Sequence, residues 1–165
     1  MKWILITLAV IAGLIAIVLA IGFLLPVKHV ATGSARFAQP TDKVFLAITE
    51  VEKFPEWRKS VERVEVLSPN GTHPRFREIG SDGSLLFETD SVIPNKRVVN
   101  RIADRSLPFG GRWIYDLTPD GGGTRLTITE EGEVYNAVYR FVSRFIMGHT
   151  RTIDRYLSDL EAHFR

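Results

Sequence analysis

The sequence predicts an α+β domain in which a curved antiparallel sheet wraps around a long C-terminal helix, preceded by one membrane-spanning helix. Three observations support this prediction. Residues 3–25 contain no charge, residues 61–134 read as short strands separated by turn signals, and residues 136–164 repeat their apolar side chains every three or four positions. Consecutive hairpins require an antiparallel sheet, and one long apolar-faced helix must pack against it.

The N-terminal segment has the length and composition of a transmembrane helix. Thr7 is the only polar side chain between Trp3 and Leu25. A helix of this length reaches ~35 Å, and the hydrocarbon core of a bilayer is ~30 Å thick. The alternative, a cleaved signal peptide, has a shorter apolar core of ~7–15 residues followed closely by small residues. We therefore expect an uncleaved anchor over residues 1–27 and a globular domain over residues 28–165.

The charges around this segment bear on its orientation. Lys2 precedes it, whereas Lys28, Arg36 and Lys43 come after it. Counting cations places the domain in the cytoplasm, but a short positive N-terminus before a long apolar run is also typical of a signal anchor that exports the domain behind it. We favour a single-pass membrane protein with its domain on the exported, periplasmic or extracellular side.

Composition argues against several classes of function. Of the 21 Lys and Arg residues only Lys2 precedes the domain, and 19 Asp and Glu residues balance them, so no basic footprint for nucleic acid is present. There is no cysteine for a disulfide or a thiolate nucleophile. The four histidines lack metal-ligand spacing, and the glycines of residues 121–123 sit in a hairpin turn rather than a phosphate loop. We expect no metal and no cofactor.

Short elements are expected ahead of the sheet. Residues 29–38 read as extended, and QPTD at residues 39–42 reads as a helix start. Pro55 cannot sit inside a helix, so a second short helical turn is expected around residues 55–58. The expected strands, bounded by Gly, Pro, Asn and Asp turn signals, cover residues 61–68, 74–80, 85–91, 97–102, 111–117 and 124–134.

The final segment predicts one long amphipathic helix that begins near Asn136, with arginines largely on its polar side. A curved sheet cannot close its concave face with side chains alone, so we expect a cavity between the sheet and this helix. The expected apolar face consists of Val138, Phe141, Val142, Phe145, Ile146, His149, Ile153, Tyr156, Leu157, Leu160 and Phe164.

Four stretches resemble the SRPBCC superfamily, the START-like, helix-grip group that includes the birch pollen allergen, lipid-transfer domains and polyketide cyclases or aromatases. The resemblance covers about residues 30–165 and implies a helix-grip fold that hosts many functions. Members of this family are usually soluble, and the apolar N-terminal segment departs from that pattern. The stretches are AQPTDKVF (38–45), VEKFPEW (51–57), LPFGGRW (107–113) with GTRLTITE (123–130), and YLSDL (156–160).

Several side chains are candidates to line the expected cavity. If Phe76 and Leu86 face it, a period of two places Glu78 and Glu88 on the same face; a slip of one residue would turn these carboxylates to solvent. Glu130 shares a face with Leu126 and Ile128, although Gly132 could mark a bulge there. The candidate ligand-binding residues are Trp57, Phe76, Leu86, Glu88, Asn100, Trp113, Tyr115, Phe141, Phe145 and His149, and the candidate acid–base residues are Glu78, Glu88 and His149.

Three functions fit this sequence. The first is a membrane-anchored binding module that holds a lipid or hydrophobic small molecule between sheet and helix. The second is a polyketide cyclase- or dehydratase-like enzyme that uses Glu78, Glu88 or His149 as acid or base. The third is a structural or regulatory membrane partner with a filled interior. Trp57 and His149 also have structural interpretations, as a packing side chain and a hydrogen-bonded histidine. The oligomeric state is not indicated.

Overall fold

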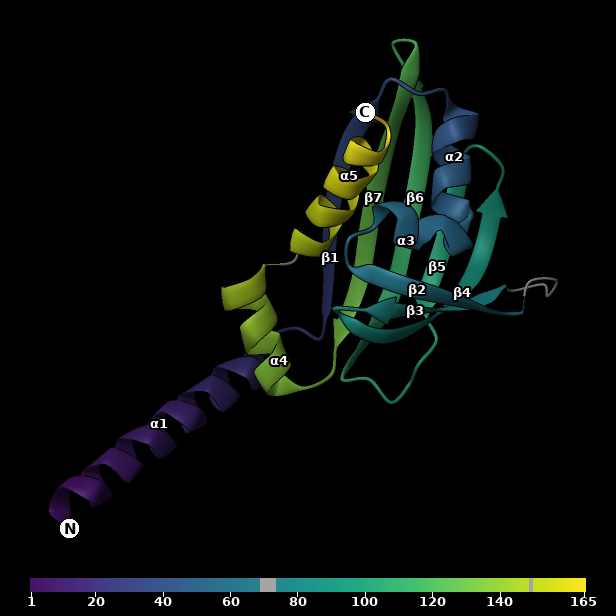
Figure 1. Cartoon of the computed structure of the whole chain (residues 1–165). Coiled ribbons are helices and arrows are strands. Elements are labelled where there is room, and N and C mark those ends of the chain that lie inside the picture. Colours follow the sequence, from purple (N-terminus) through teal and green to yellow (C-terminus); the bar gives the residue numbers. More distant parts are fainter. Residues whose placement is uncertain (69–73, 149) are drawn as a thin grey trace.

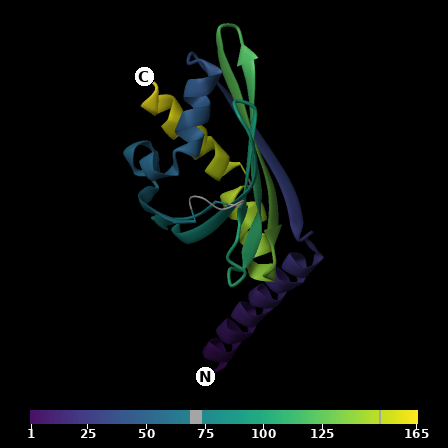
Figure 2. The same cartoon turned by 90° about the vertical axis from the view of Figure 1, so that its right-hand side faces the viewer.

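The computed structural model describes residues 1–68, 74–148 and 150–165. A curved sheet packs against helices on one face, and an apolar helix projects from the N-terminus (Figure 1 and Figure 2). This architecture confirms the predicted α+β class. The helical elements are α1 (Lys2–Leu24), α2 (Thr41–Thr49), the 3₁₀ turn η1 (Val51–Lys53), α3 (Phe54–Trp57), α4 (Ala137–Val142), the π-helical turn η2 (Ser143–Met147) and α5 (Arg151–His163).

The sheet has seven strands in the order β1-β7-β6-β5-β4-β3-β2, and every neighbouring pair is antiparallel. Strands β2 to β7 follow one another as hairpins, whereas β1 pairs along its whole length with β7. Register shifts in β2 and β4 bend the sheet. The strands are β1 (Lys28–Phe37), β2 (Val61–Ser68), β3 (Arg75–Gly80), β4 (Gly83–Ile93), β5 (Arg97–Ile102), β6 (Phe109–Asp120) and β7 (Gly123–Val134).

The core lies between α2, α5 and the β1–β7–β6 half of the sheet. Its least exposed side chains come from each of these layers: Ile48 of α2, Leu126 of β7, and Ile153 and Leu160 of α5 are at most 1% exposed. Gly33 of β1 lets α5 approach, because a Cβ at this position would lie 2.7 Å from Cγ2 of Ile153. This half of the interior is therefore solidly packed.

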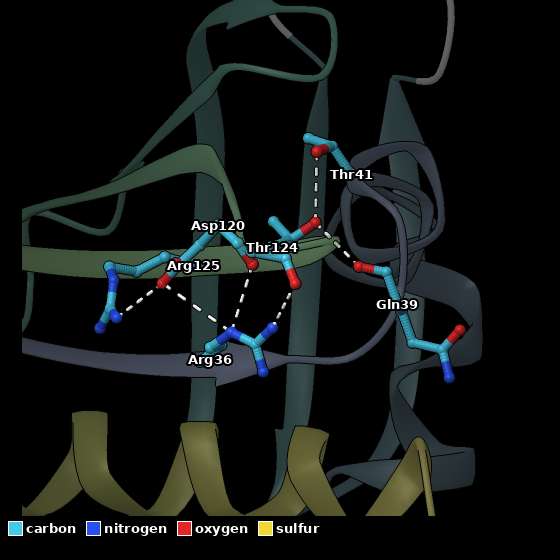
Figure 3. A network of polar contacts seen from close by, with 7 residues as sticks. Arg36, Gln39, Thr41, Asp120, Thr124 and Arg125 are labelled. Atoms are coloured by element: carbon cyan, nitrogen blue, oxygen red, sulfur yellow. Dashed lines mark hydrogen bonds and ion pairs between the residues drawn. The ribbon is translucent and has the colours of Figure 1, made fainter.

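A polar network ties the far end of the β6–β7 hairpin to the start of α2 (Figure 3). Arg36 Nε donates to the carbonyl oxygen of Asp120 at 3.2 Å, and its Nη2 donates to that of Gly121 at 2.8 Å. The buried Thr124 hydroxyl donates to the Gln39 carbonyl oxygen at 2.9 Å and contacts the Thr41 hydroxyl at 3.2 Å. These bonds satisfy polar groups at the β1–α2 junction.

Helix α1 is long and apolar enough to cross a membrane by its length and composition. Its side chains are exposed apart from those near its C-terminal end, where Gly22 is buried. The helix stops at Leu25, whose backbone is extended, immediately before Pro26. Residues 25–27 are all that separate it from β1, so the domain lies close to the end of α1.

The C-terminal helix is not continuous, which corrects the sequence prediction. Asn136 caps α4, because its Oδ1 accepts hydrogen bonds from the backbone nitrogens of Val138 and Tyr139 at 2.9 and 3.2 Å. The helix then loosens into η2 and ends at Gly148, which has a φ of +74°. Helix α5 starts again at Arg151 and covers the sheet, whereas α4 lies beside α1 (Figure 1).

Candidate ligand-binding site

The strand register decides which side chains face the concave side. Phe76 of β3 pairs with Phe87 of β4, and their rings stack with centroids 5.4 Å apart. Cross-strand partners share a face and alternate residues return to it. Glu78 therefore faces the same side as Phe76.

A buried ion pair lies at the centre of this concave side. Arg58, directly after α3, donates from Nη1 to Oε1 of Glu78 at 2.5 Å, and the two side chains are only 14% and 10% exposed. The guanidinium carbon also lies 4.9 Å from the ring centroids of both Phe54 and Tyr156. Burial lowers the pKa of the Arg58 guanidinium, but Glu78 together with the adjacent Tyr156 and Tyr115 outweighs burial, so the pKa is raised.

Aromatic side chains from three elements enclose this ion pair. Tyr156 of α5 lies 5.2 Å from Trp57 of α3, 5.6 Å from Tyr115 and 6.1 Å from Trp113 of β6, measured between ring centroids. Burial raises the pKa of both tyrosines well above the ordinary value, so their phenols stay neutral at physiological pH. We call Phe54, Trp57, Arg58, Glu78, Tyr115 and Tyr156 the polar-aromatic cluster.

Two buried polar atoms of this cluster lack a hydrogen-bond partner within the described part of the chain. They are Nε1 of Trp57 and the hydroxyl oxygen of Tyr156. The Tyr115 hydroxyl is near enough to influence Tyr156, but the two make no hydrogen bond of normal geometry. A buried unsatisfied polar group costs about 1–3 kcal/mol. The cluster can therefore receive a polar group from outside the chain.

A second polar pair lies on the same face, nearer to α1. Glu130 of β7 pairs with Trp113 across the β6–β7 ladder, and its Oε1 is 3.5 Å from Nε2 of His29 in β1. The ladder is regular through Gly132, so no bulge turns Glu130 outward. Gly132 makes room for the His29 ring, since a Cβ there would overlap the ring.

Burial raises the pKa of the Glu130 carboxyl from its ordinary 4.5 to about 7. Burial is the cause of this shift, because the Glu130 side chain is only 21% exposed. A carboxyl group with a pKa near neutrality can accept and donate a proton at physiological pH.

This shift makes stability depend on pH. Between about pH 4.5 and pH 7 the folded chain binds more protons at Glu130 than the unfolded chain, so the free energy of unfolding falls as pH rises. Glu130→Gln removes this dependence, and we expect the wild type to lose about 1–3 kcal/mol relative to the variant across the window. Urea unfolding of the full chain in detergent would measure it. Glu131→Gln, on the other face of β7, is the control, and parallel profiles for wild type and Glu130→Gln would contradict the prediction.

All four predicted ligand-binding residues on strands β3, β5 and β6 lie on the concave side. Phe76, Asn100 and Tyr115 are buried there and Trp113 is half-buried. Asn100 Oδ1 accepts a hydrogen bond from the buried Thr89 hydroxyl at 2.9 Å. Trp57, which was predicted from α3, is also buried there.

The predicted orientation of Leu86 and Glu88 is wrong. Because Phe87 stands opposite Phe76, the residues on either side of Phe87 point to the convex face. Glu88 pairs there with Arg101 at 2.7 Å and with Arg75 at 3.6 Å. Among the predicted carboxylates of β3 and β4, only Glu78 faces inward.

Two predicted residues of the C-terminal segment do not join this site. Phe141 and Phe145 belong to α4 and η2, with ring centroids 5.0 Å apart, and Phe145 is 59% exposed. The break at Gly148 carries them away from the sheet. His149 lies outside the described residues.

The sequence analysis missed Arg58, His29 and Phe87. Arg58 follows the helix-breaking FPEW sequence, where a cation next to two aromatic residues was the available signal. The sequence analysis placed Tyr156 on the apolar face of the last helix. It did not predict that the Tyr156 ring would contact the Arg58 guanidinium. Phe87 is hidden from pattern analysis because Leu85, Leu86 and Phe87 form an apolar run without alternation.

Two hollows lie at opposite ends of the sheet, and α5 lines neither of them. One, of about 590 Å³, is formed by Thr41, residues 93–97 and residues 116–119. The other, of about 300 Å³, lies where α1, β1 and α4 meet. We call the second one the anchor-side hollow.

Comparisons with known proteins agree with this geometry. Residues 28–165 match the family model described as polyketide cyclase / dehydrase and lipid transport. No curated protein is significantly similar to the chain.

The solved structures similar to this chain share its fold. A START superfamily protein from Mycobacterium smegmatis is 15% identical, with a TM-score of 0.65 over 82% of this chain and 97% of that chain. A protein from Thermus thermophilus is 17% identical, with a TM-score of 0.68 over 82% and 97%. The di-domain ARO/CYC StfQ from the steffimycin biosynthetic pathway is 15% identical, with a TM-score of 0.63 over 82% and 50%. These structures share the helix-grip fold of this chain. The match over residues 28–165 shows that the chain belongs to the family described as polyketide cyclase / dehydrase and lipid transport.

Proposed function

We propose that this protein is a membrane-anchored module that binds a lipid or hydrophobic small molecule on the concave face of its sheet. The observation that carries the proposal is the polar-aromatic cluster: a buried Arg58–Glu78 pair inside an aromatic shell, with donors on Trp57 and Tyr156 that lack a partner within the described residues. An apolar site with a few convergent polar groups is the usual design of a small-molecule site.

The coverage of the concave face supports a place for the apolar part of the ligand. Helix α5 packs over β1 and the adjoining core, while α4 turns away towards α1. Strands β4, β5 and β6 lie farther from β1. On them, the side chains of Phe87, Ile102 and Trp113 are half-buried. Their strand pairings place them on the same face as Asn100 and Glu130. The ligand would lie against these three side chains with its polar group at the cluster.

Helix α1 supplies the membrane anchor in this proposal. It is apolar over its whole length and exposed on nearly every side, which is unfavourable in water and favourable in a bilayer. The short link to β1 holds the domain at the membrane surface, so a lipid has a short path to the concave face.

We further propose that the domain lies on the exported side. The chain contains no cysteine, so one introduced at the exposed Ser158 is a unique label site. Ser158→Cys is expected to react with a membrane-impermeant maleimide in intact cells. Labelling that requires permeabilised cells would place the domain in the cytoplasm.

Mass spectrometry of the purified protein tests ligand binding. The full chain, extracted in mild detergent, is expected to carry an apolar molecule through purification. Trp113→Ala removes a wall of the proposed site and is expected to lower the bound fraction about tenfold, which corresponds to about 1.4 kcal/mol. Leu67→Ala, an exposed position on β2, is the control. A wild-type chain that carries no apolar molecule would favour a structural role with a filled interior.

One observation supports a second candidate, a cyclase- or dehydratase-like enzyme. The Glu130 carboxyl has a pKa of about 7 and adjoins Trp113 on the same face, where it could move a proton to or from a bound ligand. If the protein is an enzyme, Glu130→Gln should abolish turnover of the molecule that co-purifies and leave its binding intact. A ligand that the wild type leaves unchanged supports the binding module alone.

A further inference from the structure

The segment formed by α4 and η2 is fixed to the end of the proposed anchor. Gly22 of α1 contacts α4 so closely that a Cβ would overlap the carbonyl oxygen of Ala137. Arg140 Nε donates to the carbonyl oxygen of Gly22 at 2.8 Å, in the last turn of α1. Figure 1 and Figure 2 both show α4 beside the C-terminal end of α1. The position of the C-terminal end of α1 therefore fixes the position of α4.

Four large apolar or aromatic side chains of this segment are exposed to solvent. The side chains involved are Val138, Tyr139, Phe145 and Ile146, which are 42%, 53%, 59% and 70% exposed. They belong to a segment that packs on α1, whose own apolar side chains are also exposed. Tyrosine and other apolar side chains on a short amphipathic helix suit the boundary between head groups and acyl chains.

The anchor-side hollow adds positive charge at this boundary. It has a volume of about 300 Å³ and is lined by Leu25, Pro26, Lys28, His29, Val30, Val134, Arg140, Ser143 and Arg144.

Two of its three permanent cations have no acidic partner in the described part of the chain. Lys28 lies 3.6 Å from Glu133, but no carboxylate of the described residues lies within ion-pair distance of Arg140 or Arg144. Arg140 is also buried, at 8% exposed. A buried guanidinium without a counter-charge is costly, and the Gly22 carbonyl oxygen compensates only in part.

We propose that the anchor-side hollow binds the phosphate of an anionic phospholipid, while the apolar side chains of α4 and η2 enter the adjoining acyl region. The proposal rests on the anchoring by α1 proposed above. Arginine forms paired, charge-assisted hydrogen bonds with phosphate, and the hollow is large enough for a head group with the acyl chains outside it. The membrane-bound lipid would neutralise Arg140 and Arg144 and fix the domain's orientation on the bilayer.

Native mass spectrometry of the full chain tests this site. The protein is placed in nanodiscs that contain equal amounts of phosphatidylcholine and phosphatidylglycerol, and the lipids that stay bound after release are counted. The wild type is expected to retain phosphatidylglycerol in preference to phosphatidylcholine. Arg144→Gln is expected to lower that preference about tenfold. Arg151→Gln, which removes an exposed charge outside the hollow, is expected to leave it unchanged.

Three results would overturn the proposal. Equal retention of the two lipids by the wild type, or an unchanged preference in Arg144→Gln, would leave Arg140 as a cap on α1 and nothing more. If inorganic phosphate alone binds the detergent-solubilised chain as tightly as phosphatidylglycerol does, the ligand is free phosphate rather than lipid. A chain that does not enter nanodiscs and is extracted from membranes by alkaline carbonate contradicts the anchoring instead, so the two failures are distinguishable.

Discussion

Glu78→Gln is expected to lower the free energy of unfolding by about 3–5 kcal/mol, because it leaves the buried Arg58 without its counter-charge. The aromatic rings around Arg58 cannot replace a carboxylate in a site that excludes water. Asp116→Asn provides the comparison, because it breaks an exposed ion pair in which Arg97 is 49% and Asp116 is 34% exposed. This substitution is expected to lower the free energy of unfolding by less than about 1 kcal/mol.

The double variant Arg58→Met/Glu78→Leu separates the cost of a lone charge from the value of the pair. Both replacements are apolar and suit the aromatic shell, so most of the lost stability is expected to return. Ligand retention should not return, because the polar end of the proposed site is gone. Chemical denaturation of the full chain in detergent measures these differences. If Glu78→Gln costs no more than Asp116→Asn, the pair does not sit in a dry interior.

Ile153→Ala is expected to cost about 2–5 kcal/mol, because Ile153 is fully buried between α5 and β1. This contact holds the principal helix on the sheet. It depends on Gly33, whose missing side chain gives Cγ2 of Ile153 its place.

A double-variant cycle tests that fit. Gly33→Ala alone overpacks the contact and is expected to cost about 1–3 kcal/mol. In the Ile153→Ala background the obstructing Cγ2 is absent, so Gly33→Ala should be neutral or stabilising. The two changes are therefore expected to be non-additive by about 1–3 kcal/mol. Strict additivity would show that α5 adjusts its distance from β1 instead of being held there.

Local signals in the sequence were sufficient for the fold class. Turns such as residues 81–84 and 119–123 force hairpins, and alternation in residues 124–134 identifies the buried face of β7. The order of the elements was also read from these signals. It resembles that of SRPBCC proteins, and the family match over residues 28–165 supports that resemblance. The pairing of β1 with β7 joins segments far apart in the sequence, so local signals do not predict it.

The site was predicted only where alternation is clear. On β6, Trp113, Tyr115 and Leu117 alternate with Arg112, Ile114 and Asp116, of which only Ile114 is apolar, and they face inward. On β4 the apolar run Leu85, Leu86, Phe87 has no alternation, so its phase depends on pairing with Phe76. Every residue assigned from that strand was consequently turned to the wrong face.

The break in the C-terminal helix could not be predicted from periodicity. The apolar repeat continues through Gly148, because α4 and α5 each have an apolar face. The two faces pack on different elements. α4 packs on α1 and α5 packs on the sheet. Recognising this required the contact between Gly22 and Ala137, two residues that are separated by most of the chain.

Mapping a photoactivatable ligand tests the central claim most directly. The full chain in detergent is incubated with a palmitic acid analogue that carries a diazirine in its acyl chain, irradiated and digested, and the adducts are located by mass spectrometry. Binding on the concave face predicts adducts at Phe87, Ile102 and Trp113, which are lost on competition with unlabelled palmitic acid. Adducts confined to α1 and the convex face, or insensitive to the competitor, would contradict it.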